Sequence, residues 1–196
     1  SIMDLVDRPD FIHRMMRRFT DASLGLLDQL EAQGLLAVNM PTIHCTGAYT
    51  DELPAEGYDP EKPRAIDTWT CGMAQIFSTV SPEMHDEFEI EYAIPWYGRF
   101  GLGYYGCCEP LHDKIDIIRK IPNVRKISIS PWANVRLSAE RIGSDFVLSR
   151  KPNPVFVAGN NWDPAHIRSD LENTIELCSD HGCPVEFILK DISTVN

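Results

Sequence analysis

The stretch that decides the fold is residues 102–130, LGYYGCCEPLHDKIDIIRKIPNVRKISIS. An apolar run at 102–107 ends in two cysteines and a glutamate, and a second apolar run follows at 124–130. Between the two runs, apolar residues recur at the spacing of one helix face: Leu111, Ile115, Ile118 and Ile121. The stretch therefore predicts strand, helix and strand, the repeating unit of a parallel sheet.

The same alternation continues on both sides of this stretch. Further apolar runs that we interpret as strands lie at 35–40, 146–149 and 185–189. A long helix is predicted from Asp10, as its cap, to Gly34, and others begin at Ser81 and Asp163. Five short strands alternating with helices imply right-handed βαβ units. The predicted fold class is α/β, with a parallel sheet.

Two of these helices have apolar residues at helical spacing. The first carries Phe11, Met15, Phe19, Ala22, Leu26 and Leu30, and the last carries Ile167, Leu171, Ile175 and Cys178. Such a stripe is typical of the face that a helix buries against a sheet.

Composition restricts the protein class. A chain of 196 residues with 43% hydrophobic content can bury one core, so we predict a single domain over 1–196, with a lid-like loop at 46–65. The net charge of −11 opposes binding to nucleic acid. No apolar run approaches the roughly 18 to 20 residues of a membrane span. Six cysteines without a secretory signal favour reduced thiols in the cytoplasm.

Cys107, Cys108 and Glu109 follow directly on the strand predicted at 102–107. In parallel sheets and (β/α)8 barrels, the loops after the carboxyl ends of the strands build the active site. Sulfur ligands beside a carboxylate oxygen there suggest a metal site or a reactive thiol. A structural role is the alternative, because adjacent strand residues point to opposite faces and one cysteine can pack as a small apolar side chain.

Other strand ends carry further candidates. Lys190 and Asp191 follow the last apolar run, and we predict catalytic roles for both, together with Glu109. Lys151 and Asn153 lie in a proline-fixed loop that can receive a carboxylate or phosphate, unless Lys151 is simply a surface cation.

Trp132 follows Ser130-Pro131 at another strand end. Its ring can wall a pocket for a flat or methylated small-molecule substrate, and packing in the core is the alternative.

Several motifs carry a resemblance to a known family. They are YGCCEPLHDKIDIIRKIPNVRKISISPW at 105–132, IGSDFVLSRKPNP at 142–154, FILKDISTV at 187–195, YTDELP at 49–54 and AQIFSTVSPEMHDEF at 74–88. Together they resemble the uroporphyrinogen decarboxylase-like superfamily, in a branch related to the zinc-dependent, corrinoid-linked methyltransferases. The resemblance implies a (β/α)8 barrel of which this chain would supply about the last five strands.

The resemblance also implies a site. The zinc site of those methyltransferases resembles His-x-Cys at one strand end plus a distal cysteine, and it places Cys107 at the cysteine and Tyr105 at the histidine. We group Tyr105 with the substrate-binding residues. Lys190-Asp191 stand near the position of the distal cysteine. Zinc held by Cys107 or Cys108 would therefore need an altered ligand set, with Glu109 and Asp191.

Three functions remain open at this point. The first is methyl transfer between a small methylated substrate and a thiol or a corrinoid protein. The second is a uroporphyrinogen-type decarboxylase, although the resemblance places the substrate-binding arginines in an opening portion that has no counterpart in these residues. The third is a non-catalytic partial barrel that binds a small molecule or another chain.

A sheet with open edges generates a prediction about assembly. Five parallel strands cannot close a barrel of eight, so two edges keep unpaired backbone groups. We expect a homo-oligomer, or completion by the missing half of the barrel as a separate chain. Light scattering at low micromolar concentration measures the mass. A monodisperse monomer of 22.2 kDa that unfolds cooperatively would contradict the prediction.

Overall fold

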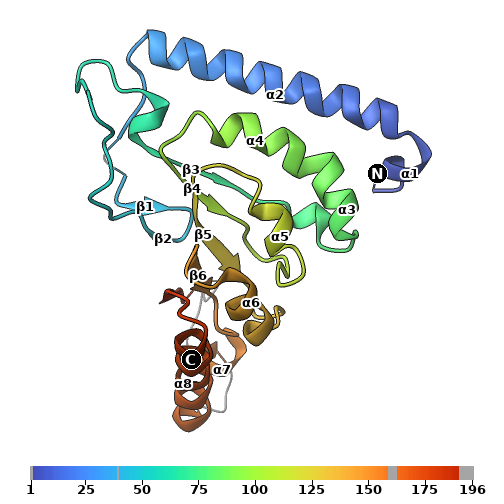
Figure 1. Ribbon diagram of the computed structural model, residues 1–196, viewed down its shortest axis with the longest axis vertical. Coiled ribbons are helices and arrows are strands. Elements are labelled where there is room, and N and C mark those ends of the chain that lie inside the picture. Colours follow the sequence, from blue (N-terminus) through green and yellow to red (C-terminus); the bar gives the residue numbers. More distant parts are fainter. Residues whose placement is uncertain (1, 39, 159–162, 190–196) are drawn as a thin grey trace.

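The computed structural model describes residues 2–38, 40–158 and 163–189. Its centre is a parallel sheet in which five strands follow one another in chain order, without closing into a barrel (Figure 1). The strands are β3 (Trp69–Gly72), β4 (Leu102–Tyr105), β5 (Val124–Ile129), β6 (Val147–Arg150) and β7 (Val185–Phe187). The predicted α/β class with a parallel sheet is confirmed.

Helices flank this sheet. The long helix α2 (Pro9–Ala32) runs beside α4 (Glu91–Tyr97), and α8 (Pro164–Asp180) lies at the opposite end of the molecule (Figure 1). The other helical segments are short: α1 (Asp4–Asp7), η1 (Ala65–Asp67), η2 (Gln75–Phe77), α3 (Pro82–His85), the π-helical η3 (Asp86–Ile90), α5 (Ile115–Ile118), α6 (Val135–Ile142) and α7 (Val155–Ala158).

One predicted strand is wrong and one was missed. Residues 35–38 and 40 form no strand, and they lead into a small antiparallel hairpin, β1 (Thr42–Ile43) with β2 (Thr46–Gly47). The sheet begins instead with β3, whose sequence WTCG is short and ends in glycine. Trp69 and Thr70 favour strands, but four residues are too few to show an alternating pattern, and pairing with β4 makes the segment a strand.

The helix starts are correct in two of three cases. Ser81 and Asp163 cap α3 and α8, where their side chains accept the backbone N–H groups of Met84 and His166. Asp10 instead lies inside α2, whose N-cap is Arg8. Pro9 occupies the first turn of α2, where its missing N–H leaves no hydrogen bond unmade.

Alternation along the strands separates two faces of the sheet. Ile127, Ile129 and Leu148 are fully buried in the main core, together with the predicted helix face of Leu111, Ile115, Ile118 and Ile121. The alternate residues Lys126 and Ser149 point to the opposite, inner face. The apolar face toward the helices thus holds the layers together.

The apolar stripes predicted on α2 and α8 coincide only in part with the buried faces, since Cys178 is buried and Met15 packs against the main core. Phe19 is 65% exposed and Ile175 is 50% exposed. The buried residues of α2 are Ile12 and Leu27, and those of α8 are Thr174, Leu177 and Cys178. Apolar spacing identified the helices but not the side that faces the sheet.

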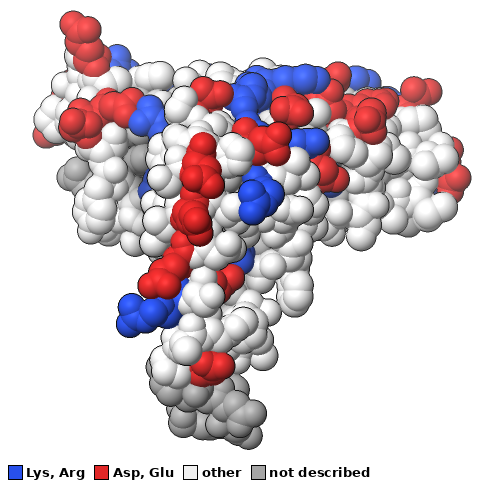
Figure 2. All heavy atoms as spheres, turned by 60° about the horizontal axis from the view of Figure 1, so that its bottom comes forward, with Lys and Arg blue, Asp and Glu red and all other residues white. Residues whose placement is uncertain are grey.

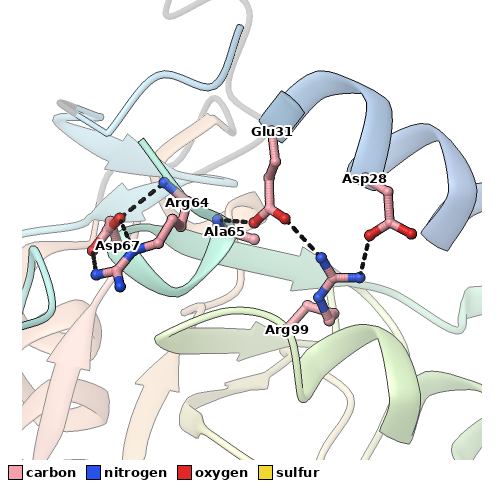
Figure 3. A network of polar contacts seen from close by, with 6 residues as sticks. All are labelled: Asp28, Glu31, Arg64, Ala65, Asp67 and Arg99. Carbon is pink, nitrogen blue, oxygen red and sulfur yellow. Dashed lines mark hydrogen bonds and ion pairs between the residues drawn. The ribbon is translucent and has the colours of Figure 1, made fainter. Parts of the chain in front are cut away.

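A network of charged groups ties the end of α2 to the start of the sheet (Figure 3). Glu31 accepts the N–H of Ala65 at 2.6 Å and a guanidinium N–H of Arg99 at 2.7 Å. Arg64 bonds Asp67 through its backbone and side chain, and these bonds hold the pKa of the Asp67 carboxyl below its usual value. The network positions the residues just before β3.

The loop at 46–65 contacts the amino-terminal ends of the strands. Glu52 pairs with Arg125 at the start of β5, and Leu53 approaches Gly101 just before β4. The thiols of residues 107 and 108 follow the opposite, carboxyl ends. A lid role for this loop stays a prediction.

The surface is mixed in charge. Acidic and basic side chains lie interspersed over the face shown in Figure 2. Exposed ion pairs such as Lys120 with Asp86 and Arg119 with Asp145 join separate elements. Each exposed pair contributes only about 0 to 1 kcal/mol, so packing of the core dominates stability.

Gly103 of β4 generates a stability prediction. A Cβ there would lie 2.5 Å from the ring of Tyr97, whose hydroxyl donates to the Tyr104 carbonyl at 2.7 Å. Because that ring is buried and held, Gly103→Ala should lower the free energy of unfolding by about 1 to 3 kcal/mol in urea denaturation.

Gly25 of α2 provides the matched control, since a Cβ there meets nothing within 4 Å. Gly25→Ala should raise the free energy of unfolding by about 0.5 to 1 kcal/mol. Equal effects of the two substitutions would show that the Tyr97 ring does not constrain β4.

Candidate functional site

The segment after β4 turns sharply at the carboxyl edge of the sheet. Gly106 has a φ of 92°, a region that favours glycine. A Cβ at this position would lie 2.5 Å from Leu111 Cδ1. The tight turn directs Cys107, Cys108 and Glu109 across the ends of the neighbouring strands.

Glu109 holds this turn from one side. Its carboxylate is buried, and its two oxygens accept the backbone N–H groups of Ala74, at 2.9 Å, and Cys107, at 3.0 Å. Ala74 follows β3 and Cys107 follows β4, so one carboxylate joins two strand ends. Hydrogen bonds to a charged acceptor are the stronger kind in proteins.

Lys151 and Ser128 hold the carbonyl of Cys107, which belongs to the next peptide group. This carbonyl accepts from Lys151 Nζ at 2.7 Å and from Ser128 Oγ at 2.6 Å. Lys151 Nζ also lies 2.8 Å from Ser128 Oγ and 6.0 Å from the ring centroid of Tyr104. Lys151 follows β6 and Ser128 belongs to β5, so four strand ends meet at the backbone of Cys107.

The thiols of Cys107 and Cys108 lie at this fixed part of the backbone. Cys107 Sγ and Cys108 Sγ are 3.4 Å apart, with Cys107 buried and Cys108 partly exposed. Cys71, on β3, is exposed, yet partial burial of its thiol and the nearby Cys45 and Cys107 thiols raise its pKa. Thiols from several segments therefore gather at one edge of the sheet.

An open groove of about 480 Å³ lies over Cys108. It is lined by Gln75, Ser78, Thr79, Cys108, Glu109, Pro110 and Trp132. Trp132 is 71% exposed, so the core-packing alternative does not hold for it. The groove combines one thiol, one large aromatic ring, neutral polar side chains and the Glu109 carboxylate, which is bound to the backbone.

The structure brings most of the predicted site residues together. Cys107, Cys108, Glu109 and Lys151 share the contacts just described, and Trp132 lines the same groove as Cys108. Lys151 is buried, so the alternative of a surface cation is wrong. Lys190 and Asp191 lie outside the described residues.

Tyr105 and Asn153 lie elsewhere. The Tyr105 hydroxyl donates to Glu89 at 2.5 Å and lies 2.8 Å from His85 Nε2, under the helices. Burial, and next the Glu89 charge, raise the pKa of Tyr105 well above its usual value. The Asn153 side chain accepts the Val155 N–H at 3.1 Å and so begins α7. Their predicted roles in substrate binding stay predictions.

Several residues of the site were not identified from the sequence. Ser128 donates to the Cys107 carbonyl, Ala74 donates its N–H to Glu109, and Gln75 lines the groove. Ser128 could have been identified from its position near the end of a predicted strand, because residues of the inner face near a strand end reach the carboxyl edge.

The inner face carries a second polar cluster. Lys126 Nζ donates to Glu186 Oε2 and to the Gly47 carbonyl, at 2.8 Å each. Glu186 Oε1 accepts from Thr46 Oγ1 and Ser149 Oγ, also at 2.8 Å. Since Thr46 and Gly47 form β2, the hairpin covers this part of the inner face and uses its polar groups. We therefore place the candidate site at the carboxyl edge.

The metal site stays a prediction. In the part of the chain that the structure describes, no three His, Cys, Asp or Glu side chains are arranged around a common metal position. Glu109 already accepts two backbone N–H groups, and the sulfurs of Cys107 and Cys108 lie 3.4 Å apart.

Comparisons with known proteins add no identification. No protein-family model, curated protein or solved structure matches this chain. Within the described ranges, no helix combines the length and apolar content that a membrane span requires.

Glu109 generates a testable prediction. In Glu109→Gln, one acceptor oxygen becomes an NH2 group that faces a backbone N–H, so one buried donor loses its partner. We expect the free energy of unfolding to fall by about 1 to 3 kcal/mol in urea denaturation.

Glu176→Gln, on an exposed face of α8, is the control. It should change the free energy of unfolding by no more than about 0.5 kcal/mol. A Glu109→Gln protein as stable as the control would mean that the carboxylate does not join the two strand ends.

Proposed function

We propose that the protein transfers a methyl group to a thiol, taking it from a corrinoid protein or a small methylated compound that binds in the groove. The observation that carries the proposal is the fixed backbone of Cys107, whose N–H is bound by Glu109 and whose carbonyl is bound by Lys151 and Ser128. Fixing a reactive group in advance lowers the entropic cost of reaching the transition state.

Each residue has a distinct role in this proposal. Cys108 is the receiving group, because it lines the groove. Its thiol loses a proton, its sulfur forms the bond to the methyl group, and the corrinoid or the demethylated compound leaves with the electron pair of the broken bond. The exposed ring of Trp132 contacts the methylated ligand, since aromatic faces bind methyl groups and methylated cations. Glu109 and Lys151 are positioning residues, because their polar atoms bond the backbone of residues 74 and 107.

Zinc is an optional part of the proposal. Tetrahedral zinc with Zn–S bonds of about 2.3 Å separates two sulfurs by about 3.8 Å, so the Cys107 and Cys108 sulfurs, 3.4 Å apart, would have to move apart to bind it. When bound, zinc would lower the pKa of a coordinated thiol. Asp191, the remaining predicted ligand, lies outside the described residues, so metal analysis of the freshly purified protein is the direct test.

A decarboxylase of porphyrinogen-like substrates has less support. Such substrates carry several carboxylates and need cations to receive them. The residues that line the groove include no lysine or arginine. Lys151 and Arg150, the nearest predicted cations, donate to backbone carbonyls of residues 107, 130 and 151.

A non-catalytic binding protein is the second candidate. The observation that favours it is that Glu109, predicted to be catalytic, and Lys151, predicted to bind substrate, both bond the backbone. In that case the groove binds a small molecule without transforming it.

Single-turnover methylation by methylcobalamin tests the proposal. We expect loss of methylcobalamin absorbance and a methylated Cys108 in peptide mass spectrometry. Cys108→Ser should slow the reaction by about 100-fold or more, because a hydroxyl is a much weaker nucleophile than a thiolate. Cys178→Ser, a buried thiol of α8, should react like the native protein.

Two results would refute methyl transfer at this site. The first is methylation that persists unchanged in Cys108→Ser. The second is turnover of uroporphyrinogen by the native chain. Binding of methylcobalamin without any methyl transfer would favour the non-catalytic candidate.

A further inference from the structure

The Cys107–Cys108 pair has a geometry that selects among ligands. The two residues are adjacent, and the only cis peptide among the described residues is Leu53–Pro54. A trans peptide separates neighbouring Cα atoms by about 3.8 Å, whereas disulfides span about 4.4 to 6.8 Å between Cα atoms. A direct bond between these sulfurs would therefore be strained, although they lie 3.4 Å apart.

A single atom inserted between the sulfurs removes this strain. The two sulfurs already approach more closely than the spacing of about 3.8 Å that tetrahedral zinc imposes. A trivalent pyramidal centre has narrower bond angles than a tetrahedral one, so it brings its two sulfur ligands closer together. The pair is thus better matched to a soft, three-coordinate centre.

We propose that Cys107 and Cys108 chelate a trivalent organoarsenical that carries one organic group, R–As(OH)2. Each thiol forms one As–S bond and breaks one As–O bond, and the thiol proton leaves with the hydroxide as water. Two As–S bonds form and two water molecules are released. Arsenic stays trivalent, so the reaction needs no oxidant or reductant. This inference does not depend on methyl transfer.

The groove provides access and space for the organic group. Cys108 lines it and can react first, and the buried Cys107 sulfur then closes the chelate from 3.4 Å away. The groove volume of about 480 Å³ accommodates a methyl or phenyl group beside Pro110 and the ring of Trp132. The Glu109 and Lys151 contacts keep the backbone of Cys107 in place, so binding costs little conformational entropy.

The chain offers a second pair of thiols as a control. Cys178 and Cys183 are buried, and a hydrogen bond from Cys183 lowers the pKa of Cys178. Cys178 lies in α8 and Cys183 precedes β7, and neither lines the groove. The double variant Cys178→Ser/Cys183→Ser removes this pair and leaves Cys107 and Cys108 unchanged.

Titration with phenylarsine oxide, followed by native mass spectrometry, tests the proposal. The native chain and the Cys178→Ser/Cys183→Ser variant should each bind one equivalent that resists excess glutathione and is released by a dithiol. Cys107→Ser and Cys108→Ser, made in the double-variant background, should bind about 100-fold more weakly, because the second bond of a chelate is intramolecular. Circular dichroism confirms that each variant is folded.

Two results would overturn the inference. Tight binding that survives in either single variant would show that the two sulfurs do not act together. Loss of binding in Cys178→Ser/Cys183→Ser alone would place the arsenical at the other pair. Cys71→Ser should retain binding, and its loss would assign the exposed thiol to the site in place of one of the adjacent pair.

Discussion

The carboxylate of Glu109 is the interaction on which the candidate site depends. It is 2% exposed and accepts one backbone N–H from the end of β3 and one from the end of β4. The ammonium of Lys151 donates to the carbonyl of the same residue, Cys107. Buried charges are costly unless they are fully hydrogen-bonded, and these bonds to the backbone meet that requirement.

At the carboxyl edge, some residues hold the backbone and others line the groove. Glu109 and Lys151 carry the charges that first suggest catalysis, yet their polar atoms hold the main chain. Besides neutral polar side chains, the groove presents sulfur and an aromatic ring to a ligand, from Cys108 and Trp132. Such a site favours soft or apolar partners over multiply charged anions, and this preference underlies both the proposed methyl transfer and the chelation of arsenic.

Much of the fold could be predicted from local patterns. Four of the five predicted strands are present, because runs such as that in β5 alternate between the core and the inner face. The strand β3 was missed because its four residues become a strand only by pairing with β4. The exposed face of α2, with Phe19, was assigned to the core for a related reason: spacing defines a helix face but not the element that covers it.

The sequence by itself determined the α/β class and the location of the thiols after a strand, because both follow from the order of apolar runs along the chain. Only the tertiary structure decided what each polar residue does. Whether Lys151 meets a ligand or a carbonyl depends on residue 107, which is 44 positions away and reaches it only through the packing of β4, β5 and β6. Tyr105 likewise turns from the groove to His85 and Glu89 because alternation along β4 points it toward the helices.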